Sequence, residues 1–323
     1  MGTASDILVR VQDLYRSFRL AGLWGKGAVL QAVTGVSLDI EEGRTLGLVG
    51  ESGCGKSTLG RLILALLLPT RGRIWFAGQD LTALRTRELK GLRRQMQIIF
   101  QDPYSSLNPR LTVRQTLEEP LLIHGLGNKQ ERRRWISELL GEVGLSEEHL
   151  ERYPHEFSGG QRQRLGIARA LTLKPRLMVA DEPVSALDVS IQAQILNLLC
   201  DLQKRYGLTY LFISHDLSVI SRVSDTIAVM YLGRIVDLAG REVFDRGPLH
   251  PYTEALLAAV PLPDPERPFR PPHLKGDPPS PLRIPSGCPF HPRCPEAQLP
   301  LCAEKVPEFR QIAPNHRVAC HLR

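Results

Sequence analysis

The sequence predicts an α/β protein built around a phosphate-binding loop, and three observations lead to this fold class. A G-x-x-x-x-G-K-S motif at 50–57 lies between an apolar strand and a helix-like run. A later apolar strand at 177–180 ends in two carboxylates. Alternating strands at 7–11 and 32–40 precede the motif, and they predict an antiparallel β-subdomain beside the α/β core.

The phosphate loop follows a strand-like run at 45–49 and opens a helix-like run at 59–68, which Pro69 stops. Its glycines let backbone N–H groups turn towards phosphates, and the helix N-terminus adds partial positive charge. Lys56 is expected to neutralise the β- and γ-phosphates, and the Ser57 hydroxyl to bind Mg²⁺. The predicted nucleotide-binding residues here are Gly50, Ser52, Gly53, Cys54, Gly55, Lys56, Ser57 and Thr58. The motif in this context predicts a nucleoside triphosphate as ligand.

Length and composition fit a globular protein with one large α/β domain and an appendage. The chain has 323 residues, of which 23% are charged. No apolar run reaches the roughly 18 residues of a transmembrane helix, and no secretory signal is visible, so residence in the cytosol is expected. The net charge of +7 is compatible with several anionic partners. No aromatic residues alternate with basic ones as in nucleic-acid binders, so nucleic acid is not predicted.

A strand pair is predicted at 73–76 and 97–100, on either side of a charged, helix-like segment at 82–94. Gln101 follows the second strand and opens a segment to Pro109 that is dense in turn formers. A glutamine in this place is suited to reach a metal ion or an attacking water and to sense the γ-phosphate. A capping glutamine is the structural alternative.

A second anion site is predicted after an amphipathic helical region at 111–152, which is broken near 125–127 and at Gly144. The site consists of Ser158, Gly159, Gly160 and Gln161, which open another helix. A helix N-terminus preceded by Ser-Gly-Gly is a ready-made anion site. One such site is compatible with a plain N-cap, but two in one nucleotide-binding chain suggest that two copies share the nucleotide.

Polar residues at strand ends predict hydrolytic chemistry. Asp181 is expected to hold the water shell of Mg²⁺, and Glu182 to polarise the attacking water as general base. Asp188 ends the turn that leads into the next helix. His215 follows a further apolar strand and is suited to hydrogen-bond the γ-phosphate, although a histidine in this place is more often structural. A final hairpin is predicted at 226–244.

The antiparallel subdomain is expected to present an aromatic ring to the adenine base. Phe18 is the first candidate, with Tyr15 and Trp24 as competitors. For each of the three, ordinary packing is the alternative.

Together these motifs resemble the full set of ATP-binding-cassette (ABC) ATPases. The resemblance rests on the phosphate loop, Gln101, the runs 158–161, 181–182 and 185–188, and His215. It covers roughly residues 6–245 and implies a RecA-like α/β core, an antiparallel β-subdomain and a helical signature subdomain. It further implies a head-to-tail dimer with two ATP molecules sandwiched between the phosphate loop of one subunit and the Ser-Gly-Gly-Gln run of the other.

Three further runs, at 100–109, 181–190 and 250–253, resemble the oligopeptide/dipeptide (and nickel) importer branch, and 104–106 resembles its second, F-type ATPase. This resemblance implies pairing with a paralogous ATPase beneath two membrane permeases, at the cytoplasmic face of the membrane, served by an extracytoplasmic peptide-binding protein. A nickel or metal-chelate importer is the first alternative. A soluble ABC ATPase acting on nucleic acid or ribosomes is disfavoured, because the chain has one cassette and no sustained heptads.

The C-terminal extension, predicted at 246–323, is loop-rich, and prolines are frequent from Pro261 onward. It carries Cys288, Cys294, Cys302 and Cys320. In a cytosolic chain, a metal site is favoured over disulfides, and four thiolates suit zinc or a [4Fe–4S] cluster. The resemblance to the importer branch implies the cluster, with zinc or free thiols as alternatives. The candidate substitute ligands are His291, His316 and His321, although ordinary surface histidines are the simpler interpretation.

Overall fold

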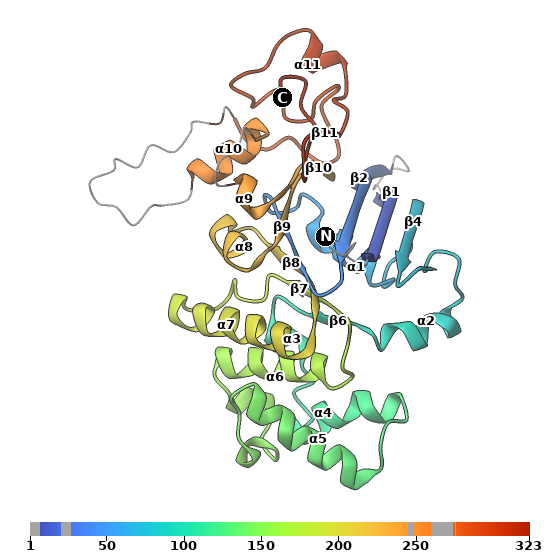
Figure 1. Ribbon diagram of the computed structural model, residues 1–323, viewed down its shortest axis with the longest axis vertical. Coiled ribbons are helices and arrows are strands. Elements are labelled where there is room, and N and C mark those ends of the chain that lie inside the picture. Colours follow the sequence, from blue (N-terminus) through green and yellow to red (C-terminus); the bar gives the residue numbers. More distant parts are fainter. Residues whose placement is uncertain (1–6, 21–26, 245–248, 260–273, 275) are drawn as a thin grey trace, which may run out of the picture. The chain divides into compact units, whose positions relative to one another are not determined.

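The computed structural model describes residues 7–20, 27–244, 249–259, 274 and 276–323, which form two compact units (Figure 1). The phosphate-loop unit consists of Ile7–Ile40, Thr45–Thr82 and Ser214–Arg323. The helical unit consists of Glu41–Arg44 and Ala83–Ile213. Trp24 and the prolines from Pro261 to Pro272 lie outside the described residues. Among the helices that are described, none has the length and apolar content needed to cross a membrane.

An antiparallel sheet in the phosphate-loop unit has the strand order β2–β1–β4–β5. Its strands are β1 (Ile7–Leu20), β2 (Ala28–Glu41), β4 (Arg71–Phe76) and β5 (Gln79–Asp80). β1 and β2 have 14 residues each, longer than the short strands predicted from the sequence. In β1, the buried Val9 and Val11 alternate with the exposed Arg10 and Gln12. This alternation is typical of a strand with one face on a core.

A second sheet of this unit contains the strand that leads into the phosphate loop. It has the order β11–β12–β10–β9–β3 within the unit. Its strands are β3 (Thr45–Val49), β9 (Thr226–Tyr231), β10 (Arg234–Gly240), β11 (Arg310–Ala313) and β12 (His316–Val318). β3 is parallel to β9, and β9 and β10 form the predicted hairpin. β12 pairs with β10 through Asp237 and Val318, so the C-terminal extension adds strands to the sheet that carries the loop.

The helices of the phosphate-loop unit are short. They are α1 (Lys56–Ile63), α8 (Leu217–Val223), α9 (Arg241–Phe244), α10 (Pro251–Ala258) and α11 (Leu301–Glu304). The prediction that the loop helix continues to residue 68 is wrong, because α1 ends at Ile63. Ala65 has a φ of 50°, which a right-handed helix cannot contain. Leu66 and Leu68 beyond it are 48% and 65% exposed.

The helical unit contains the parallel strands β6 (Met96–Ile99), β7 (Leu177–Asp181) and β8 (Thr209–Ser214) in the order β8–β7–β6. All five residues of β7 are buried, as expected for a strand covered on both faces. The predicted pairing of 73–76 with 97–100 is wrong. β4 pairs with β1, and β6 pairs with β7, because each strand joins a different sheet.

The helices of this unit are α2 (Thr86–Arg93), α3 (Pro103–Ser106), α4 (Val113–Ile123), α5 (Lys129–Glu142), α6 (Gly159–Leu171) and α7 (Val189–Tyr206), with two 3₁₀ turns at Glu147–His149 and Pro154–Glu156. Figure 1 shows α4, α5 and α6 packed together. Both predicted breaks are confirmed, because α4 ends before Gly125 and α5 ends before Gly144. Capping boxes at Thr112 and Asn128 start these helices.

A buried polar network joins the extension to β10. Asp237 is 0% exposed, and its Oδ1 lies 2.9 Å from His316 Nε2. The backbone N–H of His250 donates to Asp237 Oδ2 at 2.7 Å. His250 Nδ1 in turn accepts a hydrogen bond from the N–H of Tyr252 at 3.1 Å and so caps α10. Because the imidazole of His250 acts as an acceptor, the fold needs its neutral form.

The buried His250 predicts a loss of stability in mild acid. Burial lowers its pKa from 6.5 to about 4, although the Asp237 and Glu296 carboxylates oppose this shift and Arg323 reinforces it. Between the two pKa values, the unfolded chain binds a proton that the folded chain does not. The free energy of unfolding therefore falls as the pH falls through this window. We expect His250 to contribute about 2 kcal/mol of this loss between pH 7 and pH 5.

The substitution His250→Asn tests this prediction, because asparagine can still cap α10 but does not titrate. Urea unfolding at pH 7 and pH 5 should give a smaller difference in free energy for this variant, by about 2 kcal/mol. His155→Asn, which removes an exposed histidine, is the control. An unchanged pH dependence in His250→Asn would show that other groups cause the acid sensitivity.

Candidate functional site

The phosphate loop is closely packed against the antiparallel sheet. Gly55 has a φ of 110°, and a Cβ atom there would lie 2.1 Å from the carbonyl oxygen of Ala32. No other residue type fits this position without moving the backbone. The geometry thus explains the glycine immediately before α1.

Lys56 is held inside its own loop. Its side chain is 5% exposed, and Nζ donates to the carbonyl oxygens of Gly50 at 2.7 Å and Glu51 at 3.0 Å. A third, weak contact of Nζ is with Cys54 Sγ at 3.9 Å. A phosphate oxygen is a much stronger acceptor for an ammonium group than a thiol. The loop therefore fits a bound polyphosphate, with Ser57 and Thr58 following in the first turn of α1.

The Cys54 thiol does not compete with phosphate as an anion. Burial raises its pKa, and the nearby Lys56 ammonium opposes the shift without reversing it. A neutral thiol leaves the positive charge of Lys56 available to a ligand.

The C-terminal extension contacts the phosphate loop directly, and sequence reasoning missed this contact. Arg293 Nη1 donates to Glu51 Oε1 at 3.0 Å and Oε2 at 3.1 Å. The backbone N–H of Glu51 donates to Tyr252 Oη at 2.9 Å. Tyr252 lies in the run 250–253, whose resemblance to the importer branch gives no sign of this contact. No local pattern connects Glu51 with a residue that follows it by 242 positions.

In the helical unit, Gln101 and Glu182 are brought together. Gln101 Nε2 donates to Glu182 Oε2 at 2.9 Å. Glu182 has a φ of 47°, and its backbone N–H donates to Ile213 O at 2.9 Å. A non-glycine residue in this region costs about 1–3 kcal/mol and is enriched at functional sites. Asp181, the last residue of β7, is 5% exposed. The two carboxylates therefore lie where a strand ends, as predicted.

The Ser-Gly-Gly-Gln run forms the N-terminus of α6. Ser158 Oγ accepts from Gln161 N–H at 3.3 Å, and Gln161 Oε1 accepts from Ser158 N–H at 3.0 Å. A Cβ atom on Gly160 would lie 2.7 Å from Ile191 Cγ2, so α7 requires a glycine here. The run is thus a capped helix start packed on α7, and its contact with a nucleotide stays a prediction.

The other predicted residues lie at surfaces or have partners of their own. Phe18 is half-buried with the Arg16 guanidinium 4.5 Å from its ring centroid, and the Arg71 guanidinium lies 5.1 Å from the Tyr15 ring. His215 is exposed after β8, and Asp188 is the exposed N-cap residue of α7. Their roles in binding ATP stay predictions.

The predicted [4Fe–4S] cluster of the extension is wrong. Within the residues that the structure describes, no group of three or more His, Cys, Asp or Glu side chains is arranged to hold a metal ion. Burial raises the pKa of Cys288 to about 11 and also raises those of Cys294 and Cys320. Buried, protonated thiols pack as small apolar groups. The lack of a metal-holding group among the described residues also removes the support for zinc.

The histidines considered as substitute ligands have other partners. His291 Nδ1 lies 2.9 Å from Cys288 O, and His321 Nε2 lies 2.9 Å from Lys305 O. His316 pairs with Asp237. The three imidazole rings are thus engaged within the phosphate-loop unit.

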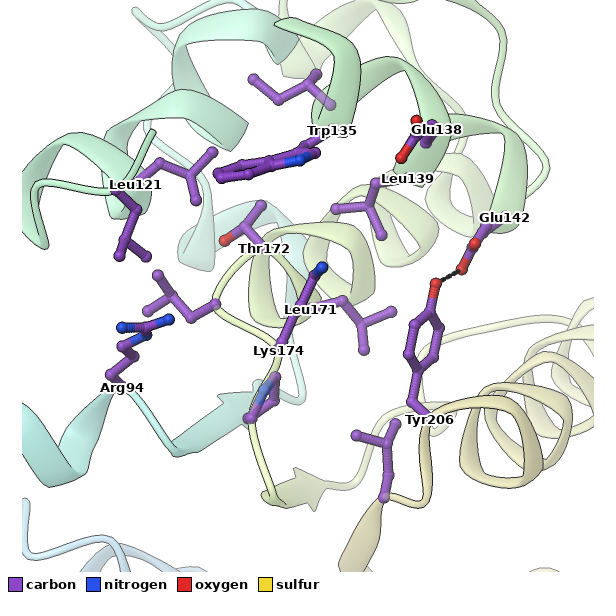
Figure 2. A pocket seen from close by; sticks show the side chains of 15 residues that line it. Arg94, Leu121, Trp135, Glu138, Leu139, Glu142, Leu171, Thr172, Lys174 and Tyr206 are labelled. Atoms are coloured by element: carbon purple, nitrogen blue, oxygen red, sulfur yellow. Dashed lines mark hydrogen bonds between the residues drawn. The ribbon is translucent and has the colours of Figure 1, made fainter. Parts of the chain in front are cut away.

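A pocket of about 250 Å³ lies in the helical unit, and Figure 2 shows its lining. Trp135 of α5 lies across it, with Lys174 Nζ 5.8 Å from the ring centroid. Apolar lining is supplied by Leu121, Leu126, Leu139, Leu171 and Leu208. Arg94, Glu138 and Glu142 add charges, and Tyr206 Oη donates to Glu142. The pocket thus combines an apolar lining with charged side chains of both signs.

Comparisons with known proteins agree with these features. Residues 33–185 match the family described as ABC transporter, and residues 236–302 match the oligopeptide/dipeptide transporter C-terminal region. The chain is 51% identical over 322 residues to the oligopeptide transport ATP-binding protein AppF of Bacillus subtilis (strain 168), covering 98% of each chain. It is 52% identical over 321 residues to the probable peptide ABC transporter ATP-binding protein y4tS of Sinorhizobium fredii, covering 99% of this chain and 91% of that one.

A solved structure confirms the predicted fold class. The ATP-binding cassette MJ0796, in a dimeric post-hydrolysis state bound to ADP and Pi, aligns with a TM-score of 0.65 and 30% identity. The alignment covers 72% of this chain and 98% of that one. Taken with the phosphate loop, the capped Ser-Gly-Gly-Gln helix and the adjacent Gln101 and Glu182, these similarities show that this chain belongs to the ABC transporter family of ATPases, with a C-terminal part of the oligopeptide/dipeptide transporter type.

Proposed function

We propose that this chain is the ATP-hydrolysing subunit of a peptide importer. The observation that carries the proposal is similarity along the whole chain, extension included, to a protein named for oligopeptide transport. In this proposal the chain works at the cytoplasmic face of the membrane. It pairs with a paralogous ATPase beneath two permeases, which receive peptide from an extracytoplasmic binding protein.

The residues of the phosphate-loop unit are proposed to bind the nucleotide. Lys56 would neutralise the phosphates, and the Ser57 hydroxyl would hold Mg²⁺, which offsets phosphate charge when bound. Phe18 would stack on the adenine, and His215 would hydrogen-bond the γ-phosphate.

The residues of the helical unit are proposed to activate water. Glu182 would take a proton from the attacking water, and the amide of Gln101, which donates to Glu182 Oε2, would orient that carboxylate. Asp181 would hold the water shell of Mg²⁺. Ser158 to Gln161 would meet the nucleotide of the paired ATPase, with Asp188 nearby in the turn before α7.

The permease contact is proposed to involve the segment from Gln101 to Pro109 and the pocket beneath Trp135. Leu122 and Ile123 of α4 are 54% and 57% exposed, next to the pocket-lining Leu121. Exposed apolar side chains beside an apolar pocket are typical of a protein-binding surface. A cytoplasmic permease segment with an aliphatic or aromatic side chain and flanking charges fits this lining.

The proposal predicts ATP hydrolysis that responds to peptide. The tagged chain should co-purify from its native membranes with two integral membrane proteins and a second ATPase. After reconstitution in liposomes with the binding protein, ATP hydrolysis should rise several-fold when peptide is added. A response to a nickel chelate instead of peptide would support the alternative importer. Co-purification with ribosomes or DNA and no membrane protein would contradict the proposal.

A further inference from the structure

Glu51, the second residue of the phosphate loop, is held at two points by the C-terminal extension. Its carboxylate accepts two hydrogen bonds from Arg293 Nη1, at 3.0 and 3.1 Å. Its backbone N–H donates to Tyr252 Oη at 2.9 Å. The extension therefore fixes both the side chain and the peptide group of one loop residue.

The two side chains of the extension that make these contacts are buried among aromatic rings. Arg293 is 6% exposed and Tyr252 is 0% exposed. Ring centroids of Tyr231 and Tyr252 lie 4.7 Å apart, and the Phe290 centroid lies 5.3 and 5.4 Å from them. Tyr231 Oη lies 3.4 Å from Arg293 Nη1. A charged group surrounded in this way has few alternative positions, and its pairing with Glu51 is poorly screened by water.

Because Glu51 belongs to the phosphate loop, its pairing with Arg293 is expected to affect ligand binding. The carbonyl oxygens of Gly50 and Glu51 hold Lys56 Nζ, and the N–H of Glu51 points to Tyr252. The peptide group between Gly50 and Glu51 thus accepts from Lys56 through its oxygen and donates to the extension through its N–H. The extension therefore orients a peptide group that holds Lys56. In addition, an unpaired carboxylate in a loop that binds phosphates would repel a polyphosphate, and Arg293 compensates this charge.

We propose that Arg293 and Tyr252 are positioning residues for nucleotide binding: through Glu51, the C-terminal extension sets the phosphate loop in the shape and charge that ATP requires. This inference rests on the ATPase activity of the chain. It assigns to the extension a task in nucleotide affinity, separate from any part in substrate choice. Neither residue touches the reacting atoms, so both are expected to change KM more than kcat.

A double-mutant cycle on the full chain tests the proposal. Arg293→Met should raise the KM for ATP about tenfold, with kcat changed less than threefold. In a Glu51→Gln background, the same Arg293→Met change should alter KM less than twofold, because no carboxylate is left to compensate. Arg293→Lys keeps the charge and should raise KM less than threefold. Tyr252→Phe keeps the ring and should raise KM a few-fold.

Arg317→Met is the matched control, because Arg317 belongs to the same extension but lies over the Phe309 ring, 4.4 Å from its centroid. It should leave KM unchanged. Titration with a fluorescent ATP analogue measures nucleotide affinity, and thermal unfolding measures stability. The two measurements together separate an effect on binding from an effect on the fold. If Arg293→Met does not fold, Tyr252→Phe carries the test, because it removes the hydroxyl that accepts from the N–H of Glu51 and keeps the ring.

Two results would overturn the inference: a KM increase that persists in the Glu51→Gln background, or a lower melting temperature with KM unchanged in all variants. A wild-type chain without ATP hydrolysis would instead contradict the assignment of the chain as an ATPase. A hydrolysing complex that ignores peptide would contradict only the proposed transport function.

Discussion

Replacing Glu182 by glutamine is expected to lower ATP hydrolysis by a factor of about 10²–10⁴ while ATP still binds. Glutamine has the same shape as glutamate, and the hydrogen bond between Gln101 Nε2 and the side-chain oxygen of residue 182 can be kept. What is lost is the ability to accept a proton from water. Single-turnover hydrolysis and ATP binding, measured on the same preparation, separate the two effects.

The matched control for this prediction is Glu42→Gln. Glu42 also belongs to the helical unit, and its carboxylate pairs with Arg176 at 2.7 Å, away from the end of β7. Removing its charge should leave hydrolysis unchanged, because an exposed ion pair contributes about 0–1 kcal/mol. Near-normal turnover in Glu182→Gln would mean that another group is the base.

The strained backbone at Glu182 adds a second expectation about the same residue. Because φ at Glu182 is 47°, replacement by glycine should relieve backbone strain and stabilise the fold. Such a variant would also lose the proposed base. A gain in stability together with a loss of hydrolysis would be the signature of strain maintained for function.

The sequence predicted the parts of the site whose chemistry is local. The phosphate loop needs Gly55 and Lys56 next to each other, and both are recognisable within one short motif. The helix that begins at the Ser-Gly-Gly-Gln run was likewise predicted, although the capping box between Ser158 and Gln161 was not. Gly125 and Gly144 correctly predicted where α4 and α5 end. In each case the recognisable pattern consists of residues close together in the sequence.

Strand pairing, one helix end and a long-range ion pair could not be predicted from the sequence. Hydrophobic alternation indicates a strand at 73–76 but not its neighbour, so the partner of β4 was assigned wrongly. The end of α1 depends on the positive φ of Ala65, a residue with high helix propensity. The pairing of Glu51 with Arg293 spans 242 positions and has no local signal.

The cysteines of the extension show the same limit. Their number and grouping suggested a metal site, but a site depends on how the side chains converge in the fold. Among the described residues they do not form a group that could hold a metal ion. Composition predicts which chemistry is available, and packing decides whether it is used.

Replacing Lys56 by methionine is expected to weaken ATP binding at least about 100-fold and to reduce hydrolysis to background. Methionine fills a similar volume without a charge, so the phosphates lose a charge-assisted hydrogen bond worth about 1.5–3 kcal/mol and a neutralising charge. The carbonyl oxygens of Gly50 and Glu51 also lose their donor. A modest fall in melting temperature should therefore accompany the loss of binding.

Calorimetric titration with ATP distinguishes the local effect of Lys56 from a general effect of charge. Lys204→Met removes an exposed positive charge near the end of α7, and it should leave ATP affinity unchanged. If both variants bound ATP like the wild type, phosphate binding would depend on backbone N–H groups alone. If Lys56→Met kept its fold but lost ATP, the ammonium held by two loop carbonyls would be the group that makes this loop specific for a polyphosphate.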